Sequence, residues 1–359
     1  MMMSNELAMA CPRNQSTHCR LYEFARAALI KIFATPYATV CDLYCGGGND
    51  IEKWDEAQIG HYIGIDVTAS GISDVREMLE SQRKAYTSEF FELDPCLENL
   101  EMHLQDKGNM ADIICCFQHL QSGFENEEKA RSLLRNVASL LRPGGYFLGI
   151  VPDSSTIWAK YQKNVEAYHN RGSTMKPNIV PTCIRSENYM ITFEVEEEKF
   201  PFFGKKYQLK FPNDVLAETH CLVHFPSMIR LARDAGLEYV EIQNLIEFYD
   251  DNRALLAGML LNSVPNLVDP RGRLLPRSYD VLGLYTTFIF QKPDPDIAPP
   301  IISPSQDGIQ NHDEREWQET SWKDDEKEGR SDSLHGLGKI SEQKGILGPG
   351  PADLRLHID

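Results

Sequence analysis

Acidic and glycine residues stand at the ends of several apolar segments of this chain. One segment contains Asp42 near its end and continues into a glycine-rich run that includes Gly46 and Gly48. Glycines in such a run let backbone amides approach a ligand closely, because no side chain intervenes. Asp66 and Asp94 end the next two apolar segments. If these segments are parallel strands, the carboxylates and the glycine run meet at one edge of a sheet, where nucleotide ligands bind.

The glycine run fits two kinds of ligand that differ in charge. A dinucleotide site requires the pattern G-x-G-x-x-G, whose third glycine lets a helix pack with its N-terminus facing a pyrophosphate. Ile51 occupies the place of that third glycine, and Asp50 puts a negative charge where the pyrophosphate would lie. S-adenosylmethionine carries a sulfonium and an ammonium group and no phosphate, so the carboxylates of Asp42 and Asp50 suit it. The sequence therefore favours S-adenosylmethionine over NAD.

The elements that position these residues alternate between helical and strand periodicity. Up to residue 150, amphipathic segments separate short apolar segments at regular intervals, which is typical of a parallel sheet with crossover helices. The segment 111–117 is apolar throughout, so both of its faces should be covered. A helix is expected at 20–33, where apolar residues recur at three- and four-residue spacing: Leu21, Phe24, Ala28 and Ile32. The expected strands are 38–44, 61–67, 88–94, 111–117 and 146–151, the last preceded by a helix that stops at Arg142-Pro143-Gly144-Gly145.

Beyond residue 150 the pattern indicates antiparallel strands and further helices. Segments 189–199 and 200–211 alternate and are predicted to be antiparallel strands joined through Phe203-Gly204-Lys205. Residues 158–212 carry nine Lys and Arg residues against six Glu residues, so phosphate groups are expected to lie there. The other expected elements are helices at 153–170 and 225–236, strands at 237–245 and 282–292, and a helix followed by a Pro-rich loop between 248 and 280.

The charge of the chain is strongly negative and unevenly distributed. A formal net charge of -17 argues against a protein that coats nucleic acid through its whole surface, so any contact with nucleic acid must be local. Residues 294–359 hold 15 acidic and 7 basic residues, and we predict that this acidic tail is largely disordered. A short motif in the tail could bind a protein partner. Residues 1–17 are expected to be a flexible N-terminus.

The sequence carries no signal-peptide pattern at its start and no apolar run that could cross a membrane. Nine cysteines, an odd number, are typical of reduced thiols in a cytosolic or nuclear protein. Cys41 and Cys45 have no second pair at zinc-ligand spacing, so structural cysteines are expected and no metal.

Four motifs resemble, in their order, those of the eukaryotic mRNA cap guanine-N7 methyltransferases. They are DLYCGGGND at 42–50, CCFQHLQSGFE at 115–125, FPFFGKKYQLKF at 200–211 and LYTTFIFQK at 284–292. More narrowly, the chain resembles a divergent second branch of this family found in plants. The third motif makes the resemblance specific, because other methyltransferases lack it.

The resemblance implies both a fold and an activity. The fold is an α/β, Rossmann-like class I S-adenosylmethionine-dependent methyltransferase, with a seven-stranded, mostly parallel sheet. It carries an antiparallel β insert for cap binding at about 172–215, within a cap 0 methyltransferase domain that spans 18–293. The activity is transfer of a methyl group from S-adenosylmethionine to N7 of the 5′ cap guanosine of RNA. The implied partner is the GpppN end of capped RNA, and the implied location is the nucleus.

The resemblance also assigns a donor site. Arg26 holds the place of a basic residue that reaches the methyl donor, and Tyr44 stands where the turn has its first glycine. Asp66 and Asp94 match the acids that bind ribose and adenine. Phe117 replaces a glutamine, which Gln118 could supply with a one-residue slip. The implied donor-binding residues are Arg26, Asp42, Tyr44, Gly46, Gly48, Asp66, Asp94, Phe117 and Gln118.

The cap-binding half departs further from the family pattern. Tyr22 and Glu23 replace two asparagines, and Gln121 and Ser122 replace a His-Tyr pair that orients guanine. His220 falls on the guanine-binding glutamate. The implied substrate-binding residues are Tyr22, Glu23, Gln121, Ser122, Pro152, Lys205, Lys206, His220 and Tyr285.

The expected reaction needs no catalytic base. Guanine N7 has a lone pair in its neutral form, so attack on a sulfonium methyl group requires no prior deprotonation, and catalysis comes from positioning and electrostatics. We therefore predict no catalytic residue in the narrow sense. Two alternatives stay open because of the replaced cap-binding residues: a catalytically weakened regulatory subunit that binds cap or S-adenosylmethionine, and a methyltransferase for another substrate.

Overall fold

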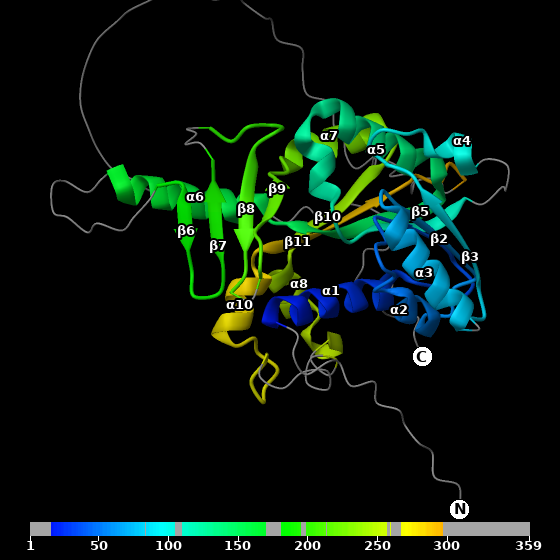
Figure 1. Cartoon of the computed structure of the whole chain (residues 1–359), viewed down its shortest axis with the longest axis horizontal. Coiled ribbons are helices and arrows are strands. Elements are labelled where there is room, and N and C mark those ends of the chain that lie inside the picture. Colours follow the sequence, from blue (N-terminus) through cyan, green and yellow to red (C-terminus); the bar gives the residue numbers. More distant parts are fainter. Residues whose placement is uncertain are drawn as a thin grey trace, which may run out of the picture. The chain divides into compact units, whose positions relative to one another are not determined.

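A computed structural model gives the fold of the part of the chain that precedes the acidic tail (Figure 1). The described residues are 16–82, 84–104, 110–169, 181–194, 199–212, 214–256, 259 and 267–296. Residues 1–15 of the expected flexible N-terminus, nearly all of the acidic tail and any partner of that tail fall outside these residues. Ser16 and Thr17 are described, and Thr17 is already helical.

A seven-stranded sheet forms the centre of the fold. Its strand order is β10-β11-β5-β4-β1-β2-β3, with parallel pairing from β5 to β3 and antiparallel pairing of β11 with both of its neighbours. This confirms the expected seven-stranded, mostly parallel sheet. The strands are β1 Thr39–Leu43, β2 His61–Asp66, β3 Thr87–Glu92, β4 Ala111–Cys116, β5 Leu141–Pro152, β10 Glu238–Asn244 and β11 Tyr285–Gln291.

Helices cover both faces of this sheet (Figure 1). Cys115 of β4 packs into one hydrophobic cluster, and its neighbour Cys116 packs into a second cluster. The expectation that both faces of the segment 111–117 are covered is therefore confirmed. The first cluster includes residues of α1 Thr17–Phe33, α2 Ile51–Glu56, α3 Ala69–Ser81, α8 Leu245–Asp251 and α10 Pro276–Leu282. The second includes residues of α4 Leu100–Leu104, α5 Glu127–Leu140 and α7 Phe225–Asp234.

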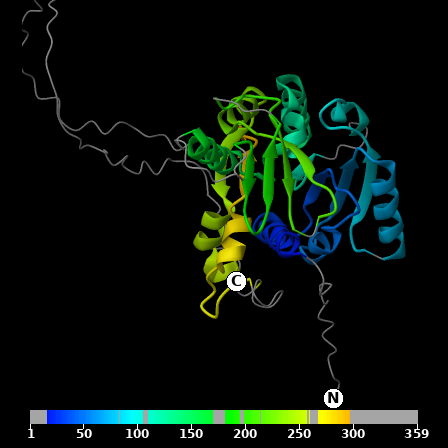
Figure 2. The same cartoon turned by 60° about the vertical axis from the view of Figure 1, so that its left-hand side comes forward.

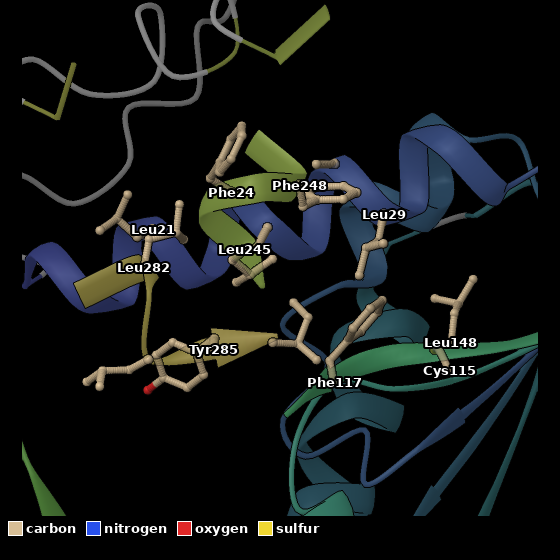
Figure 3. Close-up of a cluster of buried hydrophobic side chains, with 14 of the residues drawn as sticks. Leu21, Phe24, Leu29, Cys115, Phe117, Leu148, Leu245, Phe248, Leu282 and Tyr285 are labelled. Atoms are coloured by element: carbon tan, nitrogen blue, oxygen red, sulfur yellow. The ribbon is translucent and has the colours of Figure 1, made fainter. Parts of the chain in front are cut away.

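The expected helix at 20–33 is α1, which begins three residues earlier than expected. Ser16 caps it, because its side-chain oxygen accepts a hydrogen bond from the Cys19 backbone N–H at 3.4 Å. Leu21 and Phe24 are buried and lie against the side chains of α8 and α10 (Figure 3). The amphipathic spacing read from the sequence therefore corresponds to a real buried face.

The sequence placed the glycine pair Gly144-Gly145 at a helix stop before the fifth strand, whereas the pair lies inside that strand, β5. Helix α5 ends at Leu140, close to the predicted stop, but β5 already begins at Leu141. Ala111 pairs with Leu141 and Ile113 with Tyr146, so β5 bulges between these pairs. Gly144 has φ +77° in the bulge, and its N–H donates to the Lys292 carbonyl oxygen at 2.8 Å. Lys292, the residue that follows β11, thus stabilises a segment of β5 that the sequence predicted as the stop of the preceding helix.

A second, antiparallel sheet has the order β6-β7-β8-β9 (Figure 2). The predicted pairing of 189–199 with 200–211 is confirmed, since Phe193 of β7 pairs with Tyr207 of β8. The connection is wider than a turn at Phe203-Gly204-Lys205, because β7 ends at Phe193 and β8 begins at Lys206. The strands are β6 Cys183–Arg185, β7 Met190–Phe193, β8 Lys206–Lys210 and β9 Glu218–Cys221. Strand β9, which lies beyond residue 215, had no counterpart in the sequence prediction, and α6 Ser154–His169 matches the helix expected at 153–170.

Within the described ranges, no helix combines the length and the apolar character needed to cross a membrane.

A hydrogen-bond network joins the ends of β5, β10 and the segment before β11. The Asn244 side-chain amide donates to the Asp153 carboxylate at 2.6 Å and to the Gly283 carbonyl oxygen at 3.0 Å. Next to this network, Tyr285 pairs with Pro152 across the two strands. The network therefore fixes the position of Tyr285, the first residue of β11.

We expect Asn244→Ala to lower the free energy of unfolding by about 1–3 kcal/mol, because it leaves the buried Asp153 carboxylate without this donor. Chemical denaturation of the purified protein measures the change. Gln243→Ala, which removes only an exposed hydrogen bond to Asp251, is the matched control and should change the free energy by less than about 1 kcal/mol. Equal losses in the two variants would contradict the role assigned to Asn244.

Candidate active site

A cavity of about 360 Å³ lies among α1, the segments that follow β4 and β5, and strand β9. Side chains of both sheets contribute to it, so it forms where the carboxyl ends of β4 and β5 meet the second sheet. Its lining residues are His18, Cys19, Tyr22, Glu23, Arg26, Asn49, Gln118, His119, Gln121, Pro152, Glu218, His220 and Tyr285.

Helix α1 forms one wall of the cavity through residues that include Tyr22 and Arg26. The Tyr22 hydroxyl donates a hydrogen bond to the Phe117 carbonyl oxygen at the end of β4. The Tyr22 ring also meets the Tyr285 ring edge to face, with 5.0 Å between ring centroids. Burial raises the pKa of both phenols well above the usual range, so both hydroxyls stay protonated. The two rings form an apolar corner with fixed hydroxyl groups.

A charged cluster lies next to this wall. The Arg26 guanidinium contacts the Asp50 carboxylate at 3.1 Å, and the Lys53 ammonium contacts the same carboxylate at 3.1 Å. The negative charge that the sequence placed at Asp50 is therefore compensated by two cations. Asp42, another carboxylate at this end of the sheet, is buried and accepts a hydrogen bond from the Tyr62 hydroxyl at 2.9 Å. Burial, together with repulsion from Asp50, raises the pKa of Asp42 to about 7.

The glycine turn after β1 is held by Asp66. The Asp66 carboxylate accepts hydrogen bonds from the Gly46 N–H at 2.9 Å and from the Thr68 N–H at 2.9 Å. Gly46 has φ +53° and Gly48 has φ +77°. A Cβ atom on Gly48 would lie 2.8 Å from the Met78 Cε, whereas nothing lies within 4 Å of the corresponding position on Gly46. The left-handed backbone of Gly48, with Val75 3.0 Å from its Cβ position, thus favours glycine there, and Gly46 leaves open space on its Cβ side of the turn.

The remaining predicted donor residues divide between the cavity wall and the interior. Gln118 lines the cavity, whereas the Phe117 side chain is 2% exposed and packs in the core. The one-residue slip weighed from the sequence therefore places Gln118, and not Phe117, where a side chain can reach a ligand. Asp94 accepts a hydrogen bond from the Cys96 N–H at 2.8 Å. Tyr44 is buried, with its hydroxyl 3.2 Å from the Cys96 sulfur atom.

Six of the nine predicted substrate residues line the cavity, and three lie outside its wall. Ser122 is not a lining residue, although its neighbour Gln121 is. Lys205 is 8% exposed, with its ammonium 5.8 Å from the centre of the Phe193 ring. Lys206 contacts the Glu125 carboxylate at 2.7 Å. The two lysines expected to meet phosphates are therefore one buried residue and one ion-paired residue. The six lining residues are Tyr22, Glu23, Gln121, Pro152, His220 and Tyr285.

Gln121 and His220 bring the two sheets together at the cavity. The Gln121 side-chain amide donates to the His220 Nδ1 at 2.8 Å, which links the segment after β4 to β9. Burial and the nearby His119 lower the pKa of His220 to about 4. His220 is therefore neutral at physiological pH, and its Nδ1 can act as the acceptor that this hydrogen bond requires.

Five residues that line the cavity are absent from the predicted donor and substrate residues: His18, Cys19, Asn49, His119 and Glu218. His18 stacks on Phe211 at the end of β8, with ring centroids 3.7 Å apart; Figure 2 shows the start of α1 next to the second sheet. Helical spacing was the available signal, because His18 lies one turn before Tyr22 and so on the same face of α1.

The residues around the glycine turn fit S-adenosylmethionine. The open space over Gly46 gives a ligand access to the turn, and the Asp66 carboxylate retains lone pairs for ribose hydroxyls. The Arg26 Nε is buried and has no hydrogen-bond partner among the described residues. Arg26 also lines the cavity, and an unpartnered guanidinium N–H in such a residue suits the carboxylate of an amino-acid ligand.

A family model described as the mRNA (guanine-N(7))-methyltransferase domain matches residues 10–293. The chain belongs to this family. The match covers both sheets and every residue that lines the cavity. The resemblance read from the motifs of the sequence is therefore confirmed, and the cavity lies within the shared domain.

Two plant members of the family are similar to this chain over nearly its whole length. The mRNA cap guanine-N(7) methyltransferase 2 of Arabidopsis thaliana is 65% identical over 342 residues, which are 95% of this chain and 96% of the relative. The protein of the same name from Oryza sativa is 64% identical over 94% of this chain and 98% of the relative. The mRNA cap guanine-N(7) methyltransferase 1 of Arabidopsis thaliana is 31% identical over 64% of this chain and 61% of the relative. The chain is thus much more similar to the type 2 proteins than to this type 1 protein.

The pKa of His220 predicts how stability depends on pH. The folded-state pKa of about 4 lies below the ordinary value of about 6.5, so as pH falls from 7 to 5 the unfolded chain gains a proton that the folded chain does not. The free energy of unfolding should therefore fall by about 2 kcal/mol between pH 7 and pH 5 because of His220. We expect His220→Asn, which cannot titrate, to lose less stability than the wild-type protein between pH 7 and pH 5. Chemical denaturation at each pH measures the change, and an equal loss of unfolding free energy in both proteins would contradict this pKa.

Proposed function

We propose that this protein transfers a methyl group from S-adenosylmethionine to N7 of the 5′ cap guanosine of RNA. One observation carries the proposal: the family match spans a fold in which the glycine turn after β1 and an aromatic-lined cavity lie at neighbouring strand ends. A methyl donor at the turn and a nucleobase in the cavity would then be neighbours. The names of the plant relatives support the same reaction.

The proposed reaction is a single in-line displacement. S-adenosylmethionine supplies an activated methyl group on its sulfonium. The guanine N7 lone pair forms the new N–C bond as the C–S bond breaks, which leaves a cationic N7-methylguanine and neutral S-adenosylhomocysteine. The contribution of the chain is to hold the two reactants in line and to exclude water, because no proton has to be removed from N7.

Each group of residues has a distinct task in this reaction. Arg26 binds the donor carboxylate, and Asp66 binds the ribose while it holds the glycine turn. Tyr22 and Tyr285 present aromatic surface to the guanine ring. Gln121 offers its amide edge to the same base, with its orientation fixed by the hydrogen bond to His220.

A transfer assay tests the proposed function directly. The purified full-length chain is incubated with GpppA-capped RNA and S-adenosylmethionine labelled in its methyl group. We expect label in the cap as N7-methylguanosine, and no label in uncapped RNA of the same sequence. Absence of label in the cap, while a known cap methyltransferase works in the same buffer, would overturn the proposal. Label on free nucleosides but not on capped RNA would instead indicate a different substrate.

A second candidate function is a regulatory subunit with weak catalysis. The observation in its favour is that Gln121 and His220 bond to each other, while Lys206 is paired with Glu125. Calorimetry separates the two functions. Binding of donor or of GpppG without turnover, or turnover only after another protein is added, would favour the regulatory subunit.

We further propose that the protein acts in the nucleus and binds capped RNA, because the 5′ ends of new transcripts are made there. The acidic tail is proposed to bind a protein partner. Imaging of a fluorescent fusion tests the location, and exclusion of the fusion from nuclei would contradict it. Co-purification with and without residues 297–359 tests the partner of the tail. No metal is proposed to take part in the reaction.

We expect Asp66→Ala to weaken S-adenosylmethionine binding by about 1.5–3 kcal/mol, because hydrogen bonds to a charged acceptor are lost. This corresponds to a dissociation constant that rises roughly tenfold to more than a hundredfold. Calorimetry measures it. Asp74→Ala on the exposed side of α3 is the matched control and should bind donor as the wild-type protein does. Unchanged donor affinity in Asp66→Ala would show that the donor lies elsewhere.

We expect Tyr285→Ala to raise the KM for capped RNA more than the donor dissociation constant. Loss of one aromatic contact to a base costs about 1–3 kcal/mol, so the KM should rise roughly tenfold. Steady-state kinetics with each substrate varied in turn measure both effects. Tyr279→Ala, which removes a half-exposed tyrosine of α10, is the control. A Tyr285→Ala variant that loses donor and RNA affinity equally would contradict the assignment of Tyr285 to the base.

A further inference from the structure

Four non-glycine residues in the described part of the chain have a left-handed backbone: Tyr37, Tyr44, Gln58 and His119. This conformation brings the Cβ atom of an L-residue close to its own carbonyl oxygen and is disfavoured, most strongly for bulky side chains. Tyr37 and Gln58 lie in exposed turns joined by a hydrogen bond from the Tyr37 N–H to the Gln58 carbonyl oxygen. Tyr44 and His119 instead lie just beyond the ends of β1 and β4, at the edge of the sheet where the cavity forms.

The two left-handed residues at the cavity contact each other. The ring centroids of Tyr44 and His119 are 5.8 Å apart, and the rings meet at 68°, edge to face. Tyr44 is buried, whereas His119 lines the cavity. Unfavourable backbone conformations persist only where the surroundings enforce them, and they concentrate at functional sites.

The Tyr44 ring is fixed at its far end as well. Its hydroxyl lies 3.2 Å from the Cys96 sulfur atom, and the Cys96 N–H donates to the Asp94 carboxylate. Tyr44 therefore connects the segments that follow β1, β3 and β4. A glycine at position 44 would relieve the backbone but would leave His119 without the ring that it packs against.

We infer that Tyr44 is a positioning residue that holds His119 against the nucleobase in the cavity. The inference rests on the proposed function. His119 is the link between Tyr44 and the base-binding wall, since it lines the same cavity as Gln121 and His220, which are hydrogen-bonded to each other. Tyr44 acts through this wall and not by contact with either reactant. This replaces the donor-binding role that the resemblance implies, because the Tyr44 side chain is buried and does not line the cavity.

Kinetics of three variants test the inference. We expect Tyr44→Gly to lower kcat by at least tenfold and to raise the KM for capped RNA, while the donor dissociation constant stays within threefold of wild type. Tyr44→Phe keeps the ring and should lose less than threefold in kcat. Tyr37→Gly is the matched control, because it also replaces a tyrosine with a left-handed backbone by glycine. The Tyr37 side chain is 86% exposed, so kcat and KM should not change.

A reciprocal variant shows whether Tyr44 acts through His119. We expect His119→Ala to reproduce the loss in kcat, and the double variant with Tyr44→Gly to be no worse than either single variant. Additive losses would overturn the inference. So would wild-type kinetics in Tyr44→Gly, or a loss of donor affinity with unchanged RNA kinetics. If Tyr44→Gly does not fold, Tyr44→Asn replaces it, because asparagine tolerates the left-handed backbone.

An NMR measurement separates failure of this inference from failure of the proposed function. The ring resonances of His119 should shift in Tyr44→Gly and not in Tyr37→Gly. Addition of GpppG should move them in the wild-type protein and move them less in Tyr44→Gly. If the wild-type protein transfers no methyl group, the proposed function fails, but these resonances still decide whether Tyr44 positions His119. Unchanged His119 resonances in Tyr44→Gly would overturn the inference.

Discussion

The burial of one face of α1 against α8, α10 and the seven-stranded sheet is the contact on which the cavity depends. Leu21, Phe24 and Leu29 form this face and lie in the larger hydrophobic cluster (Figure 3). Each residue of a helix is rotated by a fixed angle from the residue before it. Burial of these three residues therefore places Tyr22 and Arg26 on the neighbouring part of the helix surface, toward the strand ends. The Tyr22 hydrogen bond to the Phe117 carbonyl oxygen then fixes α1 relative to β4. Without this packing, the glycine turn after β1 and the apolar corner formed by Tyr22 and Tyr285 would not share α1 as a common wall.

Electrostatics at the site are local and largely compensated. The chain carries a net charge of -17, yet Asp50 is balanced by Arg26 and Lys53. Asp42 has a pKa of about 7 because it is buried. A cavity of this kind does not depend on the global charge, since close contacts between partly buried groups outweigh distant, screened charges. A strongly acidic protein can therefore bind the first nucleotide of an RNA.

The elements of the fold were largely predictable, and their exceptions have physical causes. Helix α1 and the parallel strands follow from the spacing of apolar residues, which reports a buried face directly. The sequence predicted a helix stop at Arg142-Pro143-Gly144-Gly145, and only the pairing of this segment, with the hydrogen bond from Gly144 to Lys292, makes it a bulged part of β5. Strand β9 is short and carries the polar residues Glu218 and His220, so no hydrophobic pattern marks it. Its pairing with β8 defines it.

The sequence by itself determined most of the order of helices and strands, the family, and the acidic residues and glycines at the strand ends, because these depend on local periodicity and on motifs. Only the tertiary structure decided which residues face the cavity. It placed Gln118 there and buried Phe117, and it joined Gln121 to His220 from 99 residues away. A one-residue change of register at a strand end exchanges the inward and outward side chains. That choice is made by packing between distant segments, which no local pattern encodes.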